Sequence, residues 1–128
     1  MNNLNEKLLE ALELNEIDEV RKLIEAGADV NAVDKYGETA LYWASLYGYS
    51  EIVKILIEAG ADVNVVDVDG DSALHLASYG GYSEIVKILI EAGANVNVVN
   101  KWDNTALDVA SPEGHSEIVK MLVEAGAK

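Results

Sequence analysis

The segment Tyr49-Ser-Glu-Ile-Val-Lys-Ile-Leu-Ile-Glu-Ala-Gly-Ala61 is repeated along the chain. It returns unchanged at residues 82–94 and nearly unchanged at residues 115–127, 33 residues later each time, and a looser copy occupies residues 17–28. A fixed period of this length is the signature of a repeat protein, whose stacked units bury one continuous core. The sequence therefore predicts a single all-α solenoid domain of four helix-turn-helix units, at residues 1–33, 34–66, 67–99 and 100–128.

Composition and charge narrow the range of functions. The 128 residues carry a net charge of −14, spread over all four units, so the chain is a poor candidate for binding nucleic acid or anionic lipid. It has no uninterrupted apolar run of the roughly 20 residues that cross a membrane, and its start, Met1 to Leu4, lacks the basic and apolar blocks of a signal peptide. Cysteine is absent, which excludes disulfides and thiolate metal ligands. We therefore expect a soluble cytoplasmic protein that binds no membrane.

Each unit reads as two short helices that end at a glycine. In the second unit these are Thr39–Tyr47 and Ser50–Ala59, which stop at Gly48 and Gly60. Helices below about 12 to 15 residues are marginal in water, so their apolar faces must be covered by neighbouring units. Between units, segments such as 61–67 look like extended arms that lead into protruding β-hairpin turns. In the turn Asp34-Lys-Tyr-Gly37 we expect the glycine to supply the backbone angle and the aspartate a local hydrogen bond.

The two end units depart from this plan. In the first unit Asn15 takes the place of a glycine stop, and the unit has many charges and no aromatic residue, as expected of an end repeat that faces water on one side. In the fourth unit Asp103 replaces the turn glycine, and Pro112 is expected to help end the first helix.

Three segments at the 33-residue spacing carry a family resemblance. They are Thr39-Ala-Leu-Tyr-Trp-Ala44, Ser72-Ala-Leu-His-Leu-Ala77 and Thr105-Ala-Leu-Asp-Val-Ala110, and they resemble the T-P-L-H-x-A signature of the ankyrin repeat family. The chain departs from the family in having alanine for proline in all three segments, and Tyr49 and Tyr82 where histidine is usual. The resemblance implies that hairpin tips and first helices line a concave surface that contacts protein partners.

The resemblance is closer still to designed ankyrin repeat proteins, which place near-identical internal repeats between two caps. Leu8-Leu-Glu-Ala11 and Asp18-Glu-Val-Arg21 are similar to the N-terminal cap of those proteins. The resemblance implies one N-terminal cap, two internal repeats and one C-terminal cap.

The two inner units differ from each other in one region. They differ at nine positions, and eight of these lie between residues 35 and 47 of the second unit. Folding alone would not vary size and charge over the turn and first helix while keeping the second helix fixed, whereas a binding surface would. Large Tyr and Trp side chains suit such a surface because they bury much area at low entropic cost. We expect the protein-binding residues to be Lys35, Tyr36, Glu38, Tyr42, Trp43, Leu46, Tyr47, Val68, Asp69, Asp71, Tyr79, Lys101, Trp102 and Asn104.

Some aromatic residues have a structural alternative. Tyr49 and Tyr82 are identical in both inner units and are interpreted as framework. Trp43 occupies a position where the family often has a packing leucine, so filling a gap between units and contacting a partner both remain open for it. The other varied aromatics are interpreted as contacts, the alternative being solitary exposed rings, which are common.

The sequence shows no pattern typical of an enzyme or a metal site. Asp67-Val-Asp-Gly-Asp71 spaces its carboxylates as a calcium loop does, but glycine is fourth instead of sixth and Ser78 stands where the loop needs glutamate, so a turn is favoured. His75 and His115 each match a family framework position, where bonding to the backbone is usual. We predict no cofactor and no enzymatic activity.

These observations lead to one functional hypothesis and two alternatives. We predict an engineered, non-enzymatic binder of a protein target of unknown identity, monomeric on its own. One alternative is an idealised or self-associating ankyrin scaffold without a selected partner, for which residues 35–47 and 68–80 would be expected to be identical. The other is a fragment of a natural intracellular ankyrin repeat protein, for which drift in the framework would be expected. The acidic turns favour a target of basic or mixed charge.

Overall fold

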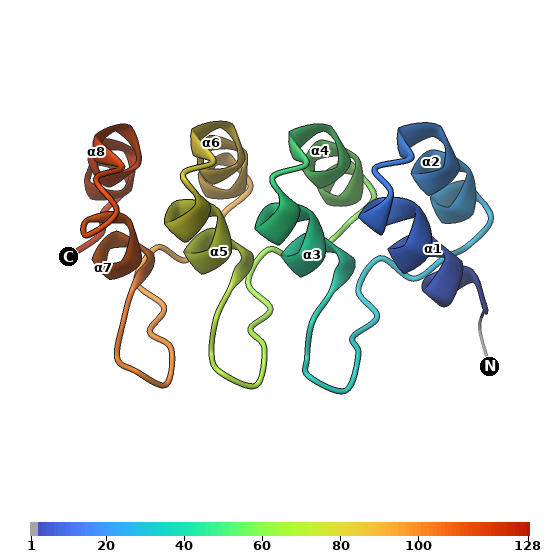
Figure 1. Cartoon of the computed structure of the whole chain (residues 1–128), viewed down its shortest axis with the longest axis horizontal. Helices are drawn as coiled ribbons and strands as arrows, with labels where there is room; N and C mark the ends of the chain where they lie inside the picture. Colours follow the sequence, from blue (N-terminus) through green and yellow to red (C-terminus); the bar gives the residue numbers. More distant parts are fainter. Residues whose placement is uncertain (1–2) are drawn as a thin grey trace.

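The computed structural model describes residues 3–128. Met1 and Asn2 lie outside the described residues, and they belong to the Met1 to Leu4 start that was predicted to lack a signal peptide. The described chain forms eight helices in four consecutive pairs that stack in one row (Figure 1). This arrangement confirms the predicted all-α solenoid. The helices are α1 Asn3–Glu13, α2 Ile17–Glu25, α3 Ala40–Tyr47, α4 Ser50–Glu58, α5 Ala73–Gly80, α6 Ser83–Glu91, α7 Ala106–Ala110 and α8 Ser116–Glu124.

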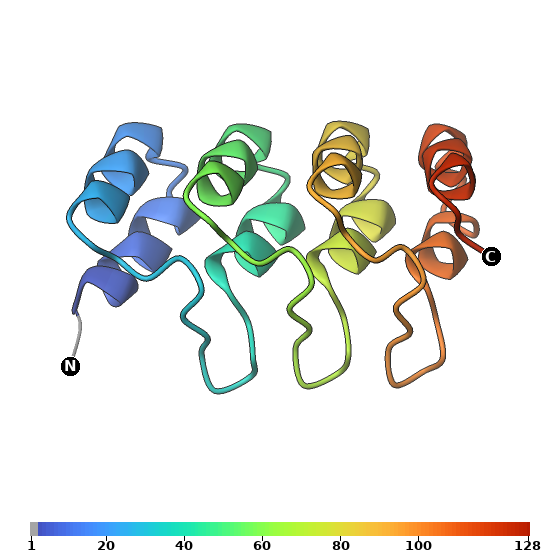
Figure 2. The same ribbon diagram turned by 180° about the vertical axis from the view of Figure 1, so that it is seen from behind.

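The helices form two layers. The first helix of each pair (α1, α3, α5 and α7) lies in one layer, and the second helices (α2, α4, α6 and α8) lie in the other (Figures 1 and 2). Each helix packs on the partner in its own pair and on the equivalent helix of the next pair. Three long loops project beyond the first helices, on the side away from the second helices, and the chain begins and ends at opposite ends of the row.

The hydrophobic core runs through all four units. Its large buried side chains come from equivalent positions, such as Ile52, Ile85 and Ile118 of the second helices, which are at most 1% exposed. Leu41 and Leu74 of the first helices are buried to the same extent. Fully burying a side chain of this kind contributes about 1.5–3 kcal/mol. Since the longest described helix has 11 residues, this shared core holds the units together more than helix propensity does.

Helices begin and end where the sequence signals lie. Thr39 precedes α3, and its Oγ1 accepts a hydrogen bond from the N–H of Tyr42; equivalent hydroxyls precede α5 and α7. Gly48 follows α3 with a φ of 78°, in the left-handed region that favours glycine. A Cβ atom at Gly48 would lie 2.6 Å from the ring of Tyr82 in the next unit. Position 48 therefore requires glycine for two reasons: its φ is positive, and the ring of Tyr82 leaves no room for a side chain.

The effects predicted for Asn15 and Pro112 in the end units are confirmed, and Asp103, for which no conformation was predicted, takes that of the glycine it replaces. Asn15 has a φ of 54° and so adopts the left-handed conformation of the glycine that it replaces. Asp103 has a φ of 63° and does the same for the turn glycine. Helix α7 ends at Ala110, two residues before Pro112.

The projecting loops differ in detail from the predicted β-hairpins. Within residues 3–128 there is no strand, and the isolated bridge pairs Val66 with Ser72. Each loop is closed by a single backbone pair and by one side chain. The N–H of Asp34 donates to the carbonyl oxygen of Glu38 at 3.1 Å, and Asp34 Oδ1 accepts hydrogen bonds of 2.9 Å from the N–H groups of Tyr36 and Glu38. A turn centred on such a side chain needs no ladder of paired backbone. The residues that hold the next two loops in the same way are Asp67 and Asn100.

A row of asparagines joins successive units. The side-chain amide of Asn31 donates to the carbonyl oxygen of Gly60 at 3.1 Å, and its Oδ1 accepts from the N–H of Asp62 at 2.8 Å. Asn64 and Asn97 bond the equivalent groups one and two units further along. Each asparagine satisfies backbone groups beside the end of the second helix in the following unit.

Candidate protein-binding surface

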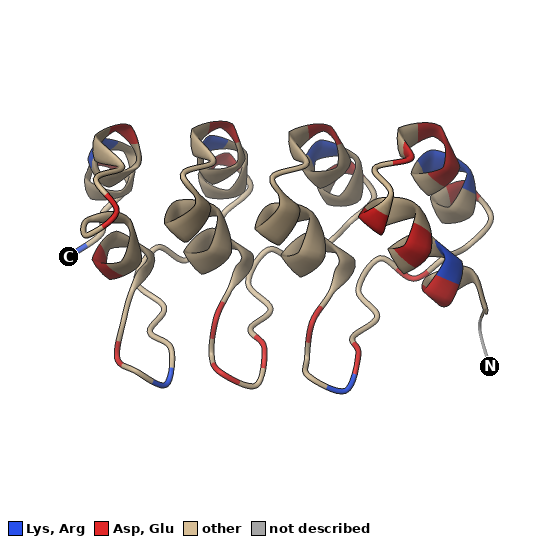
Figure 3. Cartoon of the chain, viewed as in Figure 1, with Lys and Arg blue, Asp and Glu red and all other residues tan. Residues whose placement is uncertain are grey.

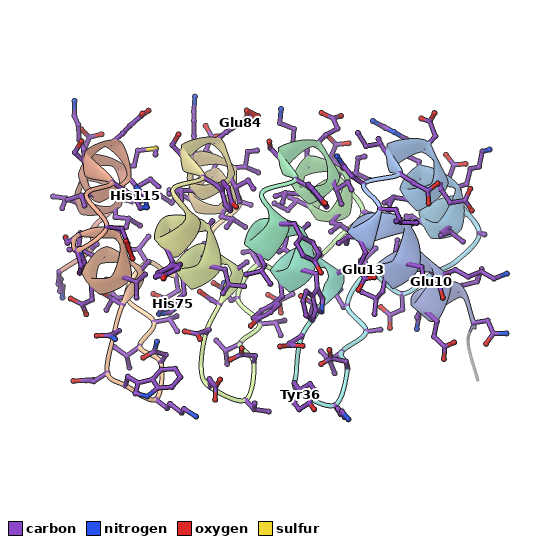
Figure 4. All side chains as sticks on the ribbon, in the orientation of Figure 1. Glu10, Glu13, Tyr36, His75, Glu84 and His115 are labelled. Atoms are coloured by element: carbon purple, nitrogen blue, oxygen red, sulfur yellow. The ribbon has the colours of Figure 1, made fainter. Side chains whose placement is uncertain are left out.

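Eight of the nine positions that distinguish the two inner units lie on neighbouring elements. They fall on loops 34–38 and 67–71, on the caps Thr39 and Ser72, and on helices α3 and α5, and the equivalent loop 100–104 continues the row. We call these three loops and two helices the variable surface. Tyr36 stands at the tip of the first loop (Figure 4).

The structure leaves all fourteen predicted contact residues at least partly accessible. The exposed ones are Lys35, Tyr36, Leu46, Tyr47, Val68, Tyr79, Lys101 and Trp102. The half-buried ones are Glu38, Tyr42, Trp43, Asp69, Asp71 and Asn104.

Four aromatic rings form a continuous row along α3. The ring centroids of Tyr42 and Trp43 are 5.7 Å apart, those of Trp43 and Tyr47 are 5.8 Å apart, and those of Tyr47 and Tyr49 are 5.4 Å apart. Such pairs contribute about 0.5–1.5 kcal/mol beyond the area that they bury. Trp43 is partly buried and packs against the hydrophobic core. Its packing role is therefore visible in the structure, and its contact with a partner stays a prediction.

The lysines of the loops already have partners. The Nζ atom of Lys35 lies 5.1 Å from the ring centroid of Tyr36. That of Lys101 lies 4.7 Å from the ring centroid of Trp102 and 2.6 Å from a carboxylate oxygen of Asp69. Both arrangements are cation–π contacts, which favour a cation over an aromatic face. In Figure 3 the loops carry mostly acidic residues, and α3 and α5 carry no charge.

The three loops are bonded to one another. The N–H of Val68 donates to the carbonyl oxygen of Tyr36 at 3.0 Å, and the N–H of Lys101 donates to that of Asp69 at 2.9 Å. These bonds link the first loop to the second and the second to the third. The side chains at the loop tips are therefore held at fixed spacing.

Glu38 lies among other acidic groups, and its pKa is strongly shifted. Burial raises the pKa of Glu38 to about 7, and a hydrogen bond with Asp34 together with the charges of Asp34 and Asp67 acts in the same direction. A hydrogen bond with Tyr42 opposes the shift. Near neutral pH, Glu38 therefore carries a proton in part of the molecules.

The pKa of Asp34 is shifted in the opposite direction to that of Glu38. Burial acts to raise the pKa of Asp34, but several hydrogen bonds to its carboxylate lower the pKa overall. The donors are the N–H and the carboxyl group of Glu38, the N–H of Tyr36 and the side chain of Trp43. Burial also raises the pKa of Tyr42, and the Asp67 carboxylate beside its hydroxyl adds to this effect. The shared proton therefore resides on Glu38 while Asp34 stays charged.

The loop 67–71 brings three carboxylates together. Oxygen atoms of Asp67, Asp69 and Asp71 lie within 4.8 Å of one another, so these residues are the group that could hold a metal ion. Each carboxylate already has a partner: Asp67 accepts from two N–H groups, Asp69 pairs with Lys101, and Asp71 accepts from the side-chain amide of Asn100 at 2.9 Å. These contacts account for the cluster as part of the turn.

The residues interpreted as framework make contacts between units. The Tyr49 hydroxyl donates to the carbonyl oxygen of Glu13 at 3.4 Å, and the ring of Tyr82 lies against Gly48. Nε2 of His75 lies 2.9 Å from the carbonyl oxygen of Asn104, and Nε2 of His115 lies 3.1 Å from that of Tyr79. The predicted bonding of both histidines to the backbone is confirmed (Figure 4).

The variable surface contains a hollow that the sequence did not predict. It has a volume of about 240 Å³ and lies where α3, α5, α7 and loop 100–104 meet; we call it the α5 hollow. Five of the predicted contact residues line it, together with residues that sequence reasoning missed, such as Leu76 and Val109. Both occupy the position of Trp43 in later units. Leu76 is the varied counterpart of Trp43 in the third unit but was not chosen as a contact, and extending the comparison to the fourth unit would have singled out Val109. The lining is Leu46, Asp71, His75, Leu76, Tyr79, Asn100, Trp102, Asn104 and Val109.

Comparison with known families agrees with this architecture. A model of three ankyrin repeats matches residues 60–128, and a model of many ankyrin repeats matches residues 23–77. The chain belongs to the ankyrin repeat family. Ankyrin repeats are generally non-enzymatic modules for protein–protein interaction, which places the variable surface on a fold of that class.

Two ankyrin repeat proteins of Rickettsia felis are similar to part of the chain. Each is 42% identical over 52 residues, which is 41% of this chain. The match covers 82% of one relative and 79% of the other. Separately, among the described helices of this ankyrin chain, none is long and apolar enough to cross a bilayer.

Proposed function

We propose that this ankyrin chain binds a protein partner through the variable surface. The observation that carries the proposal is the distribution of differences between two otherwise near-identical inner units. Eight of the nine lie in the turn and first helix, and they change size and charge there while the second helices α4 and α6 have the same sequence. The exposed large side chains on these elements, including Tyr36, Tyr79 and Trp102, supply the kind of anchor that dominates binding energy.

The same pattern favours an engineered origin for the binder. The framework of the inner units is copied with a single difference outside the varied region, at Asp62 and Asn95. Natural repeats usually drift at framework positions as well. The Rickettsia felis relatives fit the alternative of a piece of a natural ankyrin repeat protein, which would bind a partner through the same elements.

A scaffold that associates with itself is the competing function. The charge of −14 opposes it, because two copies of this chain would repel each other. We expect light scattering over a wide concentration range to give the mass of one chain. A mass that rises with concentration would support self-association instead.

Capture from a lysate followed by mass spectrometry, with matched variants, tests the proposal. A triple variant in which Tyr36, Tyr47 and Trp102 become alanine should lose the captured protein while staying folded by circular dichroism at the temperature of capture, with a melting temperature lowered by the lost ring contacts of Tyr47. A control that replaces Leu14 and Val123 by alanine removes exposed apolar side chains outside the variable surface and should keep it. Equal capture by the parent and the triple variant would refute the assignment of the surface.

A further inference from the structure

The α5 hollow combines apolar walls with one charged group. Leu46, Tyr79 and Trp102 stand around it from three different units, and each is at least 40% exposed. Leu76 and Val109 add further apolar lining. The carboxylate of Asp71 is the charged group of the lining. A side chain with a long apolar stem and a cationic head matches this combination.

The charge of Asp71 has no cationic partner among residues 3–128. One of its oxygens accepts a hydrogen bond from the Asn100 side chain at 2.9 Å, and the nearby Lys101 pairs with Asp69 instead. An apolar occupant would take this carboxylate out of water without replacing its solvation, which is costly. An anionic occupant would be repelled. The lining therefore selects for positive charge.

Loop 100–104, next to the hollow, already contains a cation that is bound by a carboxylate and an aromatic ring. Lys101 lies between the carboxylate of Asp69 and the face of Trp102, at 2.6 Å and 4.7 Å. A cation is thus held by one carboxylate and one indole ring directly beside the hollow. The hollow offers a second carboxylate, Asp71, and a second ring, Tyr79, beside the Trp102 ring that it shares with Lys101.

We propose that the α5 hollow receives an arginine side chain of the protein partner. The stem packs against Leu46 and Tyr79, and the planar guanidinium stacks on Trp102 and donates to Asp71. Arginine suits this arrangement better than lysine because its planar head can stack and hydrogen-bond at once. This inference rests on the proposed function, since it names the residue that the partner inserts.

An NMR titration with short peptides tests the inference without the partner. The probes are acetyl-Gly-Arg-Gly-amide and the same peptide with citrulline, which has nearly the same shape and no charge. The indole N–H of Trp102 reports on the α5 hollow, whereas Trp43 lines a separate hollow with the acidic residues Glu13 and Asp34, so the two tryptophan signals are followed separately. We expect the arginine peptide to shift the Trp102 signal to saturation. The citrulline peptide should bind at least about tenfold more weakly.

Two variants sharpen the test. Asp71→Asn removes the charge while its side-chain oxygen can still accept from Asn100, and it should weaken the arginine peptide about tenfold. Tyr79→Ala removes an exposed wall and should weaken both peptides, which keeps the test decisive if the first variant folds poorly. Equal affinity for the two peptides, a Trp102 signal that the arginine peptide does not shift, or unchanged affinity in Tyr79→Ala would each overturn the inference.

The outcomes separate this inference from the proposed function. If the arginine peptide does not bind while the triple variant loses its captured partner, the surface is right and the arginine assignment is wrong. If the peptide binds but the triple variant keeps the partner, the hollow accepts arginine and the partner docks elsewhere, which refutes both the proposed surface and the role of the hollow in it.

Discussion

His75 and Asn104 are joined across the boundary between the third and fourth units, with Nε2 of the histidine 2.9 Å from the main-chain oxygen of the asparagine. On the other side of the ring, Nδ1 lies 3.1 Å from the main-chain N–H of Ser72. Because a carbonyl can only accept and an N–H can only donate, the proton of His75 resides on Nε2.

This arrangement predicts both a tautomer and a loss of stability. We expect nitrogen NMR to show the Nε2–H form of His75, and His75→Ala to lower the free energy of unfolding in urea by about 2 kcal/mol, because buried polar groups would lose their partners. His115→Ala is the control, since His115 is more exposed and makes one such bond, and it should cost about half as much. Equal losses in the two variants would contradict this account.

Gly48 and Gly60 of the second unit are glycines for different reasons: Gly60 because of its positive φ alone, and Gly48 because of its positive φ and the neighbouring ring of Tyr82. Both have positive φ, but a Cβ at Gly48 would collide with the Tyr82 ring, whereas a Cβ at Gly60 would have nothing within 4 Å. Gly60→Ala should therefore cost about 1 kcal/mol for backbone strain alone, and Gly48→Ala should cost at least about 2 kcal/mol. Urea unfolding of the two variants checks this order, and a larger loss in Gly60→Ala would reverse it.

Ser45 and Ser78 are equivalent residues whose hydroxyls are fully buried without a hydrogen-bond partner among the described residues. Replacing either by alanine should raise the free energy of unfolding by about 1 kcal/mol, because an unsatisfied polar group is removed at little loss of packing. The two gains should add, since the residues lie in different units. Ser72→Ala, which removes the cap of α5, should instead lower stability by about 1 kcal/mol. A loss of stability in both buried variants would show that the hydroxyls are bonded.

Glu38 predicts a dependence of stability on pH. Its pKa is about 7 in the folded chain against an ordinary value of 4.5, so the folded state binds the proton more tightly and the free energy of unfolding falls as pH rises through this interval. After allowance for solvent screening, the loss is on the order of 1–2 kcal/mol. Glu38→Gln should remove it, because the amide cannot ionise beside Asp34 and Asp67. Urea midpoints of both proteins from pH 5 to pH 8 measure the difference, and parallel curves would contradict the shifted pKa.

The fold could be predicted from the sequence because its determinants are local and repeated. The 33-residue period, the threonine and serine caps and the glycine stops each specify a helix end, and stacking follows because such short helices need neighbours. Even the exceptions were interpretable, since Asn15 and Asp103 are residue types that tolerate a positive φ.

The site was only partly predictable because it is assembled across units. Comparing the inner units identified residues that the structure leaves accessible, but their role in binding stays a prediction. The α5 hollow escaped prediction because Leu46, Leu76 and Trp102 are far apart in sequence and meet only through the stacking. The loops were predicted in part: the local hydrogen bonds of Asp34 and the positive φ of Gly37 are confirmed, whereas no strand forms beside them in the described residues. Trp43 could not be assigned without its surroundings, which place it against the core.

The bonds from Val68 to Tyr36 and from Lys101 to Asp69 link each of the three loops to the next and restrict their relative movement. A partner therefore meets a shape that exists before contact, and the entropy that flexible loops lose on association is already lost when this chain folds. Side chains at the tips can then be exchanged one at a time, altering which protein is held while the backbone that presents them keeps its form.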